Sequence, residues 1–367
     1  MDERIHDHAE VLLDWSARVE AGDNVVLSAG PAAHDLAVAV AEGIGERSAN
    51  LLTTYADGEL QRAYLRAHDE AFDEEPAHEL ALMEAADVVL SVGGGRNTAE
   101  SSDVPGDREN AYRQAREQIR EARYDTRWVG TVHPTRSLAQ QAGMSIAAYR
   151  DFVYNAVLRD WESLAEEMAQ LKAILDEGSE VRLVGPGTDL RMSIEGRTAV
   201  NSCASVAYDS HNLPSGEVFT APFATDGEVT FDVPMTIKGT RVQDVRLTFE
   251  DGTVTDMAAG AGESVLQDVL DTDAGARRLG ELGIGMNRGI DRFTDSILFD
   301  EKMAETVHLA LGRAYDACLP DGETGNESAH HVDLITDVSE DARLEVDGEV
   351  VQRNGTFRWE AGFDTGG

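Results

Sequence analysis

The sequence predicts an α/β domain with a mainly parallel sheet, followed by a β-rich α+β domain. In the first half, short apolar runs alternate with helical segments, which is the pattern of βαβ units. In the second half, short alternating segments are joined by Asp-Gly and Asn-Gly steps, which favour tight hairpins. The length of 367 residues, 42% of them hydrophobic, suits two cores better than one. We therefore expect domains at residues 1–177 and 178–367.

The N-terminal half is expected to form four strands separated by helices. Residues 3–20 place their apolar side chains near one helical face. A long helical region is expected over residues 145–177, where apolar residues recur every three or four positions. The predicted strands are the apolar runs at residues 24–28, 50–55, 87–92 and 128–133.

A glycine triplet, Gly93–Gly95, directly follows the third predicted strand. Glycine-rich turns at the carboxyl end of a strand can hold phosphate. This one lacks GxGxxG spacing and a GKS or GKT ending, so we interpret it as a turn with unusual backbone angles. A nucleotide- or phosphate-binding α/β protein remains the alternative function. His34 and His133 follow strand ends and are interpreted as surface or loop residues.

The charge balance excludes two classes of partner. There are 69 acidic and 31 basic residues, a formal charge of −38, and lysine occurs only at Lys172, Lys238 and Lys302. Such a charge repels nucleic acid and anionic membranes. We interpret it as the surface of a halophilic protein, whose self-repulsion salt would screen.

The expected location is the cytoplasm. Cys203 and Cys318 form no metal-type pair and fit a reducing compartment. The charged N-terminus shows no signal peptide, and no apolar run approaches the length of a membrane span.

Four pieces of the second half carry candidate metal ligands. Glu217 opens a strand-like EVFTAP, Glu281 precedes an apolar glycine-rich turn, and His308 occupies one face of an alternating segment. His331 and Asp333 are two residues apart, so a strand would point both to one face. Three carboxylates and two imidazoles suit a pair of divalent ions such as Zn²⁺, Co²⁺ or Mn²⁺. Taken singly, each residue also has a structural interpretation, as a strand-end carboxylate, a core histidine or a His–carboxylate pair.

These pieces resemble a known family. PSGEVFTAP, ELGIGMN, LFDEKMAETVHLALGRAY and GNESAHHVDLITD are similar to the signature segments of the thermophilic aminopeptidases, the M29 metallopeptidases. GPGTDLRMSIEGR resembles a segment upstream of the family's first ligand. The resemblance is strongest over residues 185–337 and looser in the N-terminal half.

The resemblance implies that five residues coordinate two metal ions, and it implies an active-site tyrosine at Tyr315; the five are Glu217, Glu281, His308, His331 and Asp333. It also implies a homodimer acting on short peptides. Many relatives have two consecutive glutamates where this chain has Gly216–Glu217, which leaves Glu217 as the candidate ligand.

Two further family positions are less defined. The HxD step selects His331 over its neighbour His330. Asp300, Glu301 and Lys302 match a DEK step, and Lys302 either contacts substrate or pairs with Glu301, which is the favoured alternative.

The predicted function is a metal-dependent aminopeptidase that releases N-terminal residues from short peptides. Two close cations would activate a water and polarise the scissile carbonyl, and the substrate's free α-amine would ligate one of them. Glu217 or Glu281 would take the proton of the water. Tyr315 would donate a hydrogen bond to the developing oxyanion.

Overall fold

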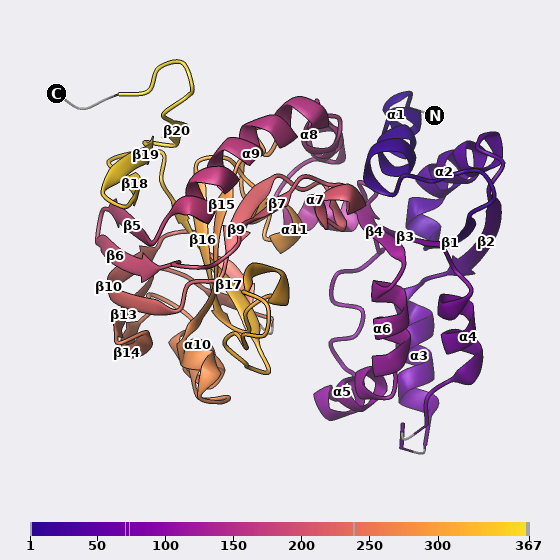
Figure 1. Ribbon diagram of the computed structural model, residues 1–367. Coiled ribbons are helices and arrows are strands. Elements are labelled where there is room, and N and C mark those ends of the chain that lie inside the picture. The colour runs from indigo at the N-terminus through magenta and orange to yellow at the C-terminus, as the bar shows by residue number, and fades with distance from the viewer. Residues whose placement is uncertain (1, 70, 73, 238, 365–367) are drawn as a thin grey trace. The chain divides into compact units, whose positions relative to one another are not determined.

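The computed structural model describes residues 2–69, 71–72, 74–237 and 239–364. It divides into two compact units (Figure 1). The first unit comprises Met1–Arg159 together with Ala204–Pro214, and the second comprises Asp160–Cys203 together with Ser215–Gly367.

The first unit is built on a five-stranded sheet in the order β2-β1-β3-β4-β8. Every neighbouring pair in it is parallel. The runs predicted as strands form its first four members, and the short β8 is supplied by the segment that lies between β7 and β9 of the second unit. The strands are β1 (Asn24–Ala29), β2 (Asn50–Tyr55), β3 (Val88–Gly93), β4 (Arg127–Val132) and β8 (Asn212–Leu213).

Helices surround this sheet, as expected for parallel strands buried on both faces. The 3-10 turn η2 (Pro31–Ala33) leads from β1 into α2, which packs on β1 and β2 and on the N-terminal α1 with its π-helical continuation η1 (Val11–Ser16). A second group, α3 to α6, shares contacts between α4 and α6 and between α3 and α5. The helices are α1 (Arg4–Glu10), α2 (His34–Glu46), α3 (Gly58–Ala67), α4 (Ala77–Glu84), α5 (Gly106–Gln114), α6 (Glu117–Tyr124), α7 (Arg136–Gln141) and α8 (Ile146–Val157).

The second unit contains a large antiparallel sheet in the order β14-β13-β10-β6-β5-β18-β19-β20. The predicted Asp-Gly and Asn-Gly turns are confirmed: Asp251–Gly252, Asp347–Gly348 and Asn354–Gly355 all have positive φ at both residues, which tight hairpins require. The strands are β5 (Glu180–Gly185), β6 (Thr188–Ser193), β10 (Ala224–Phe231), β13 (Val245–Glu250), β14 (Thr253–Ala258), β18 (Arg343–Val346), β19 (Glu349–Arg353) and β20 (Thr356–Phe357). A separate hairpin joins β11 (Met235–Ile237) and β12 (Thr240–Val242).

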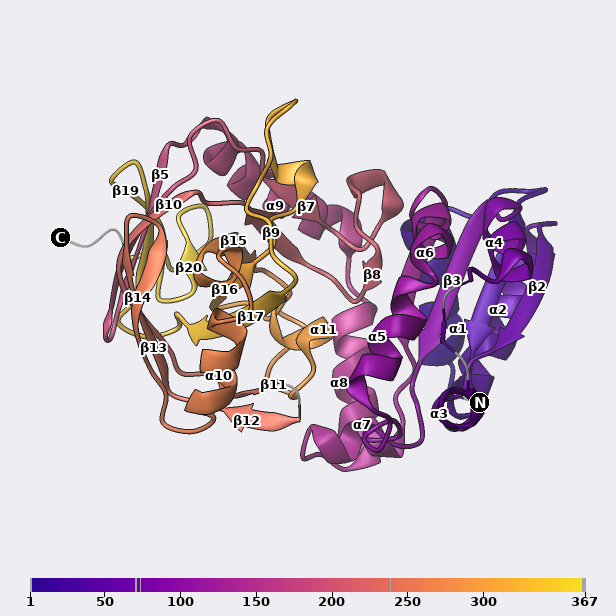
Figure 2. The same cartoon turned by 90° about the horizontal axis from the view of Figure 1, so that it is seen from below.

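A smaller antiparallel sheet of the second unit, in the order β17-β16-β15-β9-β7, carries the predicted ligands. Figure 2 shows β9, β15, β16 and β17 beside one another. Its strands are β7 (Val200–Ser202), β9 (Glu217–Thr220), β15 (Leu279–Gly285), β16 (Thr306–Gly312) and β17 (His331–Asp337). The long helix α9 (Trp161–Glu177) packs on β7 and β9. The remaining elements are α10 (Glu263–Leu270), α11 (Ile297–Asp300) and three 3-10 turns, η3 (Val206–Tyr208) in the first unit, η4 (Gly275–Arg277) and η5 (Asp316–Cys318).

The predicted fold class is confirmed, with a parallel α/β unit and a β-rich antiparallel unit. The single helical region expected over residues 145–177 is wrong, because it forms α8 and α9. The Asp160 carboxylate caps α9 by accepting from Ser163 N at 3.1 Å, so a new helix begins there. The expected boundary at residue 177 coincides with the end of α9, while contacts group α9 with the second unit.

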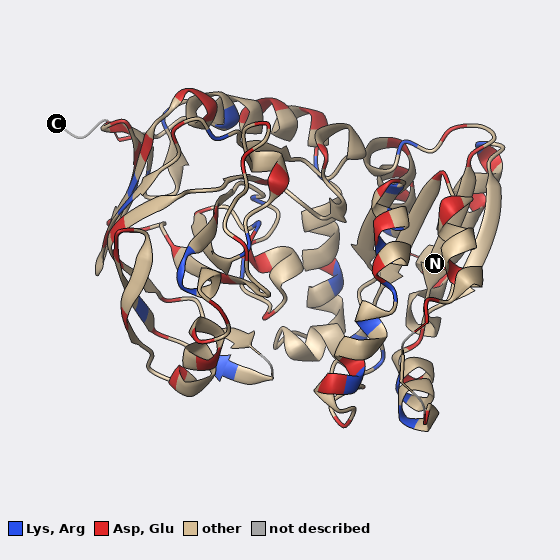
Figure 3. Ribbon diagram, turned by 60° about the horizontal axis from the view of Figure 1, so that its bottom comes forward, with Lys and Arg blue, Asp and Glu red and all other residues tan. Residues whose placement is uncertain are grey.

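The acidic residues are spread along helices and strands of both units, and the basic residues are few among them (Figure 3). Among the described residues, none of the helices combines the length and hydropathy that a membrane span requires.

Candidate metal centre

The five predicted ligands lie on one face of the small sheet. Glu281 on β15 is paired with Ala310, and Ala310 with Asp333 on β17, so both carboxylates point the same way. His308 and His331 are each two residues from a member of this row and share its face. Glu217 joins them because it pairs with Gly285 across β9 and β15. The scattered sequence positions therefore converge through strand register.

Small residues opposite the ligands make room for their side chains. His308 is paired with Gly283, and a Cβ added at Gly283 would lie 2.0 Å from the imidazole ring. Any side chain there would displace His308. The glycines of LGELGIG thus belong to a buried strand, and the expectation that Glu281 precedes a turn is wrong. The glycine-rich run resembles a turn in sequence, because the His308 ring that fills the space beside Gly283 belongs to another strand and cannot be inferred from the run itself.

The donor atoms form two adjoining groups that share Glu281. Donor atoms of Glu217, Glu281 and His308 all lie within 4.8 Å of one another, and so do those of Glu281, His331 and Asp333. One Glu281 oxygen, Oε1, is 3.3 Å from His308 Nε2, and the other, Oε2, is 3.1 Å from His331 Nε2. His308 Nε2 is 3.5 Å from Glu217 Oε2, and His331 Nε2 is 3.4 Å from Asp333 Oδ1. A carboxylate between two donor groups can bridge two cations.

Two observations fit this donor set to metal ions. The Nδ1 of His331 lies 2.8 Å from the Arg313 carbonyl oxygen, so Nδ1–H donates to it and the Nε2 lone pair faces the carboxylates. Glu217 is 6% exposed, yet no hydrogen bond from a described residue reaches its Oε2. A buried carboxylate oxygen without a donor is costly, and a cation would satisfy it. Metal-ion ligation therefore accounts for both atoms.

In the absence of a cation, protons on the two imidazoles balance the negative charge of the carboxylates. Burial disfavours charge on His308, but its hydrogen bond to Glu281 and the charge of Glu217 raise the pKa of His308 to about 9. Burial also opposes charge on His331, while hydrogen bonds to Asp333 and Glu281 raise its pKa to about 11. Burial alone would raise the pKa of Glu281, yet the two imidazoles lower it to about 2. Cations entering the site would displace these protons.

A buried lysine adjoins the carboxylates, and no sequence pattern predicted its burial. Lys302 is fully buried, pairs with Glu301 and places Nζ 3.5 Å from Glu217 Oε1. The favoured pairing of Lys302 with Glu301 is confirmed, and the contact with Glu217 is additional. Burial raises the pKa of Glu301 to about 8, although Lys302 lowers it. Lys302 therefore helps to hold Glu217 in place.

Asp300, the first residue of the DEK step, has a structural role. Its buried carboxylate accepts hydrogen bonds from Thr294 N and Thr294 Oγ1 at 2.8 Å and from Ser296 N at 3.1 Å. These bonds fix the loop that leads into α11, and Asp300 belongs to neither donor group.

Tyr315 lies at the edge of the ligand cluster. Tyr315 is 48% exposed, and its ring centroid lies 4.9 Å from that of His331 and 5.6 Å from that of Phe219. The adjacent His330 is outside both donor groups, as the HxD step predicted. His34 and His133 belong to neither donor group: His34 is exposed at the start of α2, and His133 is a buried loop residue rather than a surface one.

The loop before Glu217 explains why a glutamate is absent at position 216. Gly216 has φ +116°, and an added Cβ would lie 2.9 Å from the Cβ of Asn287. Asn287 is buried and donates from Nδ2 to the Ser215 carbonyl oxygen at 2.8 Å, while Met286 N donates to the Gly216 carbonyl oxygen. The contribution of Asn287 was not predicted, because a lone asparagine after a glycine-rich run resembles a turn residue.

The class of protein follows from these features and from sequence comparison. A profile described as thermophilic metalloprotease (M29) matches residues 1–357. The class of protein that the fold, the carboxylate–imidazole cluster and this match define is a metal-dependent peptide hydrolase.

The chain belongs to the M29 metallopeptidase family. It is 31% identical to aminopeptidase T of Thermus thermophilus over 93% of each chain, and 26% identical to aminopeptidase PepS of Streptococcus thermophilus over 91% of this chain and 92% of that one. The solved structure of wild-type AmpT from Thermus thermophilus matches with a TM-score of 0.84 at 28% identity, covering 97% of this chain and 99% of that one. The predicted family and enzyme class, an aminopeptidase-type metallohydrolase, are confirmed.

The same architecture is found outside peptidases. The 2,5-dihydroxypyridine dioxygenase of Pseudomonas putida KT2440 matches with a TM-score of 0.59 at 15% identity, covering 98% of this chain and 99% of that one. At that identity the likeness concerns the fold alone.

Proposed function

We propose that this enzyme removes N-terminal residues from short peptides with two divalent cations held by Glu217, Glu281, His308, His331 and Asp333. The observation that carries the proposal is the position of Glu281, whose two carboxylate oxygens face different imidazoles at 3.3 and 3.1 Å. A single cation would need only one of the two donor groups. Zn²⁺, Co²⁺ and Mn²⁺ all accept this mixed oxygen and nitrogen donor set.

When bound, the cations would supply Lewis-acid activation of a water and of the scissile carbonyl. The protein's own groups perform the proton transfer. Glu217 and Glu281 are the two carboxylates beside His308 Nε2, at 3.5 and 3.3 Å, and one of these two is the proposed proton acceptor. Lys302, 3.5 Å from Glu217 Oε1, orients the Glu217 carboxylate.

Tyr315 is the proposed hydrogen-bond donor to the substrate oxyanion. Its ring contacts His331 at the margin of the cluster and is half-exposed, so that a bound peptide can reach its hydroxyl. An oxyanion donor acts in the transition state, and its removal lowers kcat by about a hundredfold or more. Tyr315→Phe is expected to lower kcat by that order with little change in metal content.

Metal content and activity test the proposal together. Purified protein is stripped with chelator, reloaded separately with Zn²⁺, Co²⁺ or Mn²⁺, and assayed with leucine p-nitroanilide while bound metal is measured per chain. Two ions per chain and activity restored by reloading are expected. One ion in the fully active enzyme would contradict the two-cation part, and no activity with any of the three would contradict the peptidase part.

A matched pair of variants separates the site from the fold. Glu281→Gln removes the shared carboxylate charge and is expected to lose both ions and turnover while keeping the circular dichroism of the parent. Glu195→Gln changes an exposed glutamate in a turn and should leave both properties unchanged. Near-parental turnover in Glu281→Gln would remove this residue from the centre.

Substrate preference and assembly need separate measurements. A free α-amine requirement predicts that an N-acetylated peptide is resistant, and a preference for short peptides predicts that kcat/KM falls as the peptide lengthens. The expected homodimer is measured by sedimentation. The cytoplasmic location and halophilic character stay predictions.

A further inference from the structure

A large cavity lies within the first unit, in a part of the chain that the peptidase proposal does not use. Its volume is about 880 Å³, within the size range of small-molecule sites. Residues that follow β1, β2 and β3 line it, including Gly30, Asp57 and the Gly93–Gly95 loop. In the order β2-β1-β3-β4, the chain leaves β1 toward β2 on one side and leaves β3 toward β4 on the other side. Open α/β sheets bind ligands at the carboxyl ends of strands at such a point.

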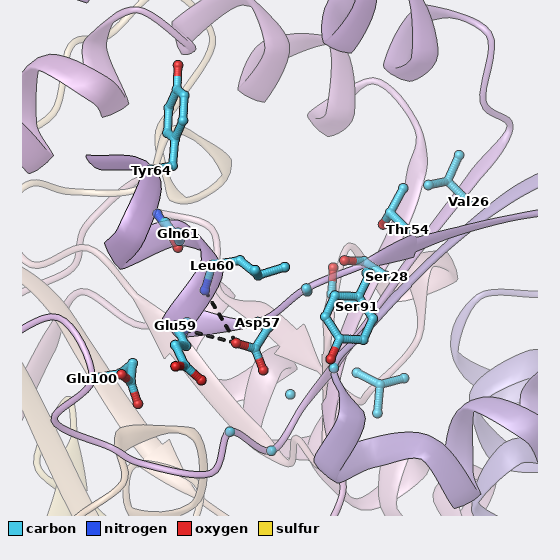
Figure 4. Close-up of a pocket in the computed structure, with 18 of the residues that line it drawn as sticks. Val26, Ser28, Thr54, Asp57, Glu59, Leu60, Gln61, Tyr64, Ser91 and Glu100 are labelled. Atoms are coloured by element: carbon cyan, nitrogen blue, oxygen red, sulfur yellow. Dashed lines mark hydrogen bonds between the residues drawn. The ribbon is translucent and has the colours of Figure 1, made fainter. Parts of the chain in front are cut away.

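The sheet surface beneath the cavity is polar where an apolar surface would be expected. Ser28 on β1 pairs in register with Thr54 on β2 and with Ser91 on β3. Parallel partners point to the same face, so three hydroxyl side chains form a row across three strands. Figure 4 shows these residues on the cavity wall, with the Ser28 and Thr54 side chains adjacent. Val26 and Val89, two residues earlier on their strands, continue this wall as apolar contacts.

Arginines line the part of the cavity formed by β3, α5 and α6. Among the described residues, the lining includes five arginines and four acidic residues, so it is close to neutral in a chain whose formal charge is −38. Arg96 and Arg120 are exposed, and their guanidinium groups have no hydrogen bond or ion pair with any described residue. The buried Nε of Arg123 also lacks an acceptor within the described part of the chain. These donors favour an anion with several oxygens, such as phosphate.

The Gly93–Gly95 loop leaves space for such an anion close to the backbone. Gly94 has φ +124°, and an added Cβ would lie 2.8 Å from the His133 carbonyl oxygen, so only glycine fits without strain. The amide nitrogens of Gly94 and Gly95 donate no hydrogen bond within the described residues. The loop thus combines free amides with neighbouring arginines, although it lacks the GxGxxG spacing.

Carboxylates and tyrosines also line the cavity: Tyr55, Asp57 and Tyr64 come from β2, α3 and the turn between them, and Glu100 and Tyr112 come from the loop after β3 and from α5. One oxygen of Asp57 caps α3 by accepting from Glu59 N at 3.0 Å and Leu60 N at 3.4 Å, and Figure 4 shows its second oxygen turned away from those amides. Glu100 packs beside Gly58 and also lines the cavity. Carboxylates after the second strand suit a sugar diol. Tyr55, Tyr64 and Tyr112 offer aromatic surface for a planar ring.

We propose that this cavity binds a small phosphate-bearing ribonucleoside, with the phosphate toward the arginines and the glycine loop and the ribose hydroxyls toward Asp57. The site shares no described residue with the metal centre, since the described residues that line it all belong to the first unit. It does not depend on the proposed peptidase mechanism. A simple dicarboxylate would use the arginines but neither the carboxylates nor the aromatic surface.

Calorimetric titration of the full-length protein with AMP, adenosine, inorganic phosphate and succinate tests the ligand class. AMP is expected to bind more tightly than phosphate, adenosine or succinate. Equal affinities for AMP and phosphate would overturn the nucleoside part, and tighter binding of succinate would overturn the phosphate part. No heat with AMP or phosphate at millimolar concentrations would overturn the site.

Variants locate the binding. The double substitution Arg96→Ala with Arg120→Ala removes two exposed guanidinium groups and should weaken AMP binding by about tenfold or more for each group removed. The value of kcat/KM on leucine p-nitroanilide should stay unchanged. Arg150→Ala removes an exposed arginine outside the cavity and is the matched control. Binding unchanged in the double variant, or lost in Glu281→Gln with its altered metal centre, would refute this location.

Discussion

The substitution Gly283→Ala tests whether the small residues of β15 position the metal centre. The added Cβ would lie 2.0 Å from the His308 ring, and ordinary contacts begin near 3.4 Å, so the ring must move by about 1.4 Å. Displacements of about 1 Å in an active site cost roughly a hundredfold in rate. Crowding a packed interior costs about 1–3 kcal/mol of unfolding free energy. We therefore expect a folded protein with kcat/KM reduced about a hundredfold or more and a lower metal content.

The measurements are kcat/KM on leucine p-nitroanilide, metal per chain and the urea midpoint. Gly130→Ala is the control, because this strand glycine in β4 has no heavy atom closer than 3.9 Å to its added Cβ. Retention of parental activity and metal content by Gly283→Ala would refute the reasoning, since His308 would then tolerate displacement. Equal losses in both variants would show a general effect of alanine in strands.

Three further predictions concern buried charge, acid and salt. Lys302→Met leaves Glu217 and Glu301 without their buried cation and should lower the unfolding free energy of the metal-free protein by about 3–5 kcal/mol. The control Lys172→Met removes a partly exposed ion pair and should change the unfolding free energy by less than about 1 kcal/mol. Comparable urea midpoints for the two variants would contradict this prediction. Burial lowers the pKa of His8 to about 3, so below pH 6.5 the unfolded chain binds a proton that the folded chain does not. The unfolding free energy should therefore fall by up to about 1.4 kcal/mol per pH unit between pH 6.5 and pH 3. The variant His8→Gln should flatten this pH dependence, and an unchanged slope in the variant would contradict the prediction. Because the net charge is −38, the urea midpoint should rise between about 0.1 and 1 M KCl, and a lower midpoint at high salt would argue against halophilic adaptation.

The hydrogen bonds of His8 explain why it stays neutral. Its Nε2 lies 2.7 Å from Thr131 Oγ1, and that hydroxyl donates to the Leu213 carbonyl oxygen at 2.8 Å. Thr131 must therefore accept from His8 Nε2–H, which leaves Nδ1 as the unprotonated nitrogen. No described residue accepts from Nδ1, so a second proton there would be buried without a partner.

Strands and turns were predictable because their signals are local. The β2 run Asn50–Tyr55 matches its predicted bounds, and the Asp-Gly turn at Asp251 forms as expected. The break between α8 and α9 was missed because apolar periodicity continues across it, and the Asp160 cap was not recognised.

The candidate site was predictable as a set of residues but not as a geometry. The HxD step placed His331 and Asp333 on one strand face correctly. The position of Glu281 between two imidazoles depends on which strands are neighbours, and spacing along the chain carries no such information. Lys302 is similar: its burial against Glu217 arises from a loop-to-strand contact that its own neighbours in sequence do not indicate.

The short strand β8 has a consequence for dissecting this protein. The backbone passes from one unit to the other after Arg159, Cys203 and Pro214. Truncation at Arg159 would therefore remove the edge strand of the parallel sheet and the Leu213 carbonyl that orients Thr131 toward His8. An independent first unit needs residues 204–214 grafted back through a linker, and the remaining chain needs a bridge between Cys203 and Ser215. The two units are thus encoded as interleaved segments, and recombination at a single site would not exchange either of them whole.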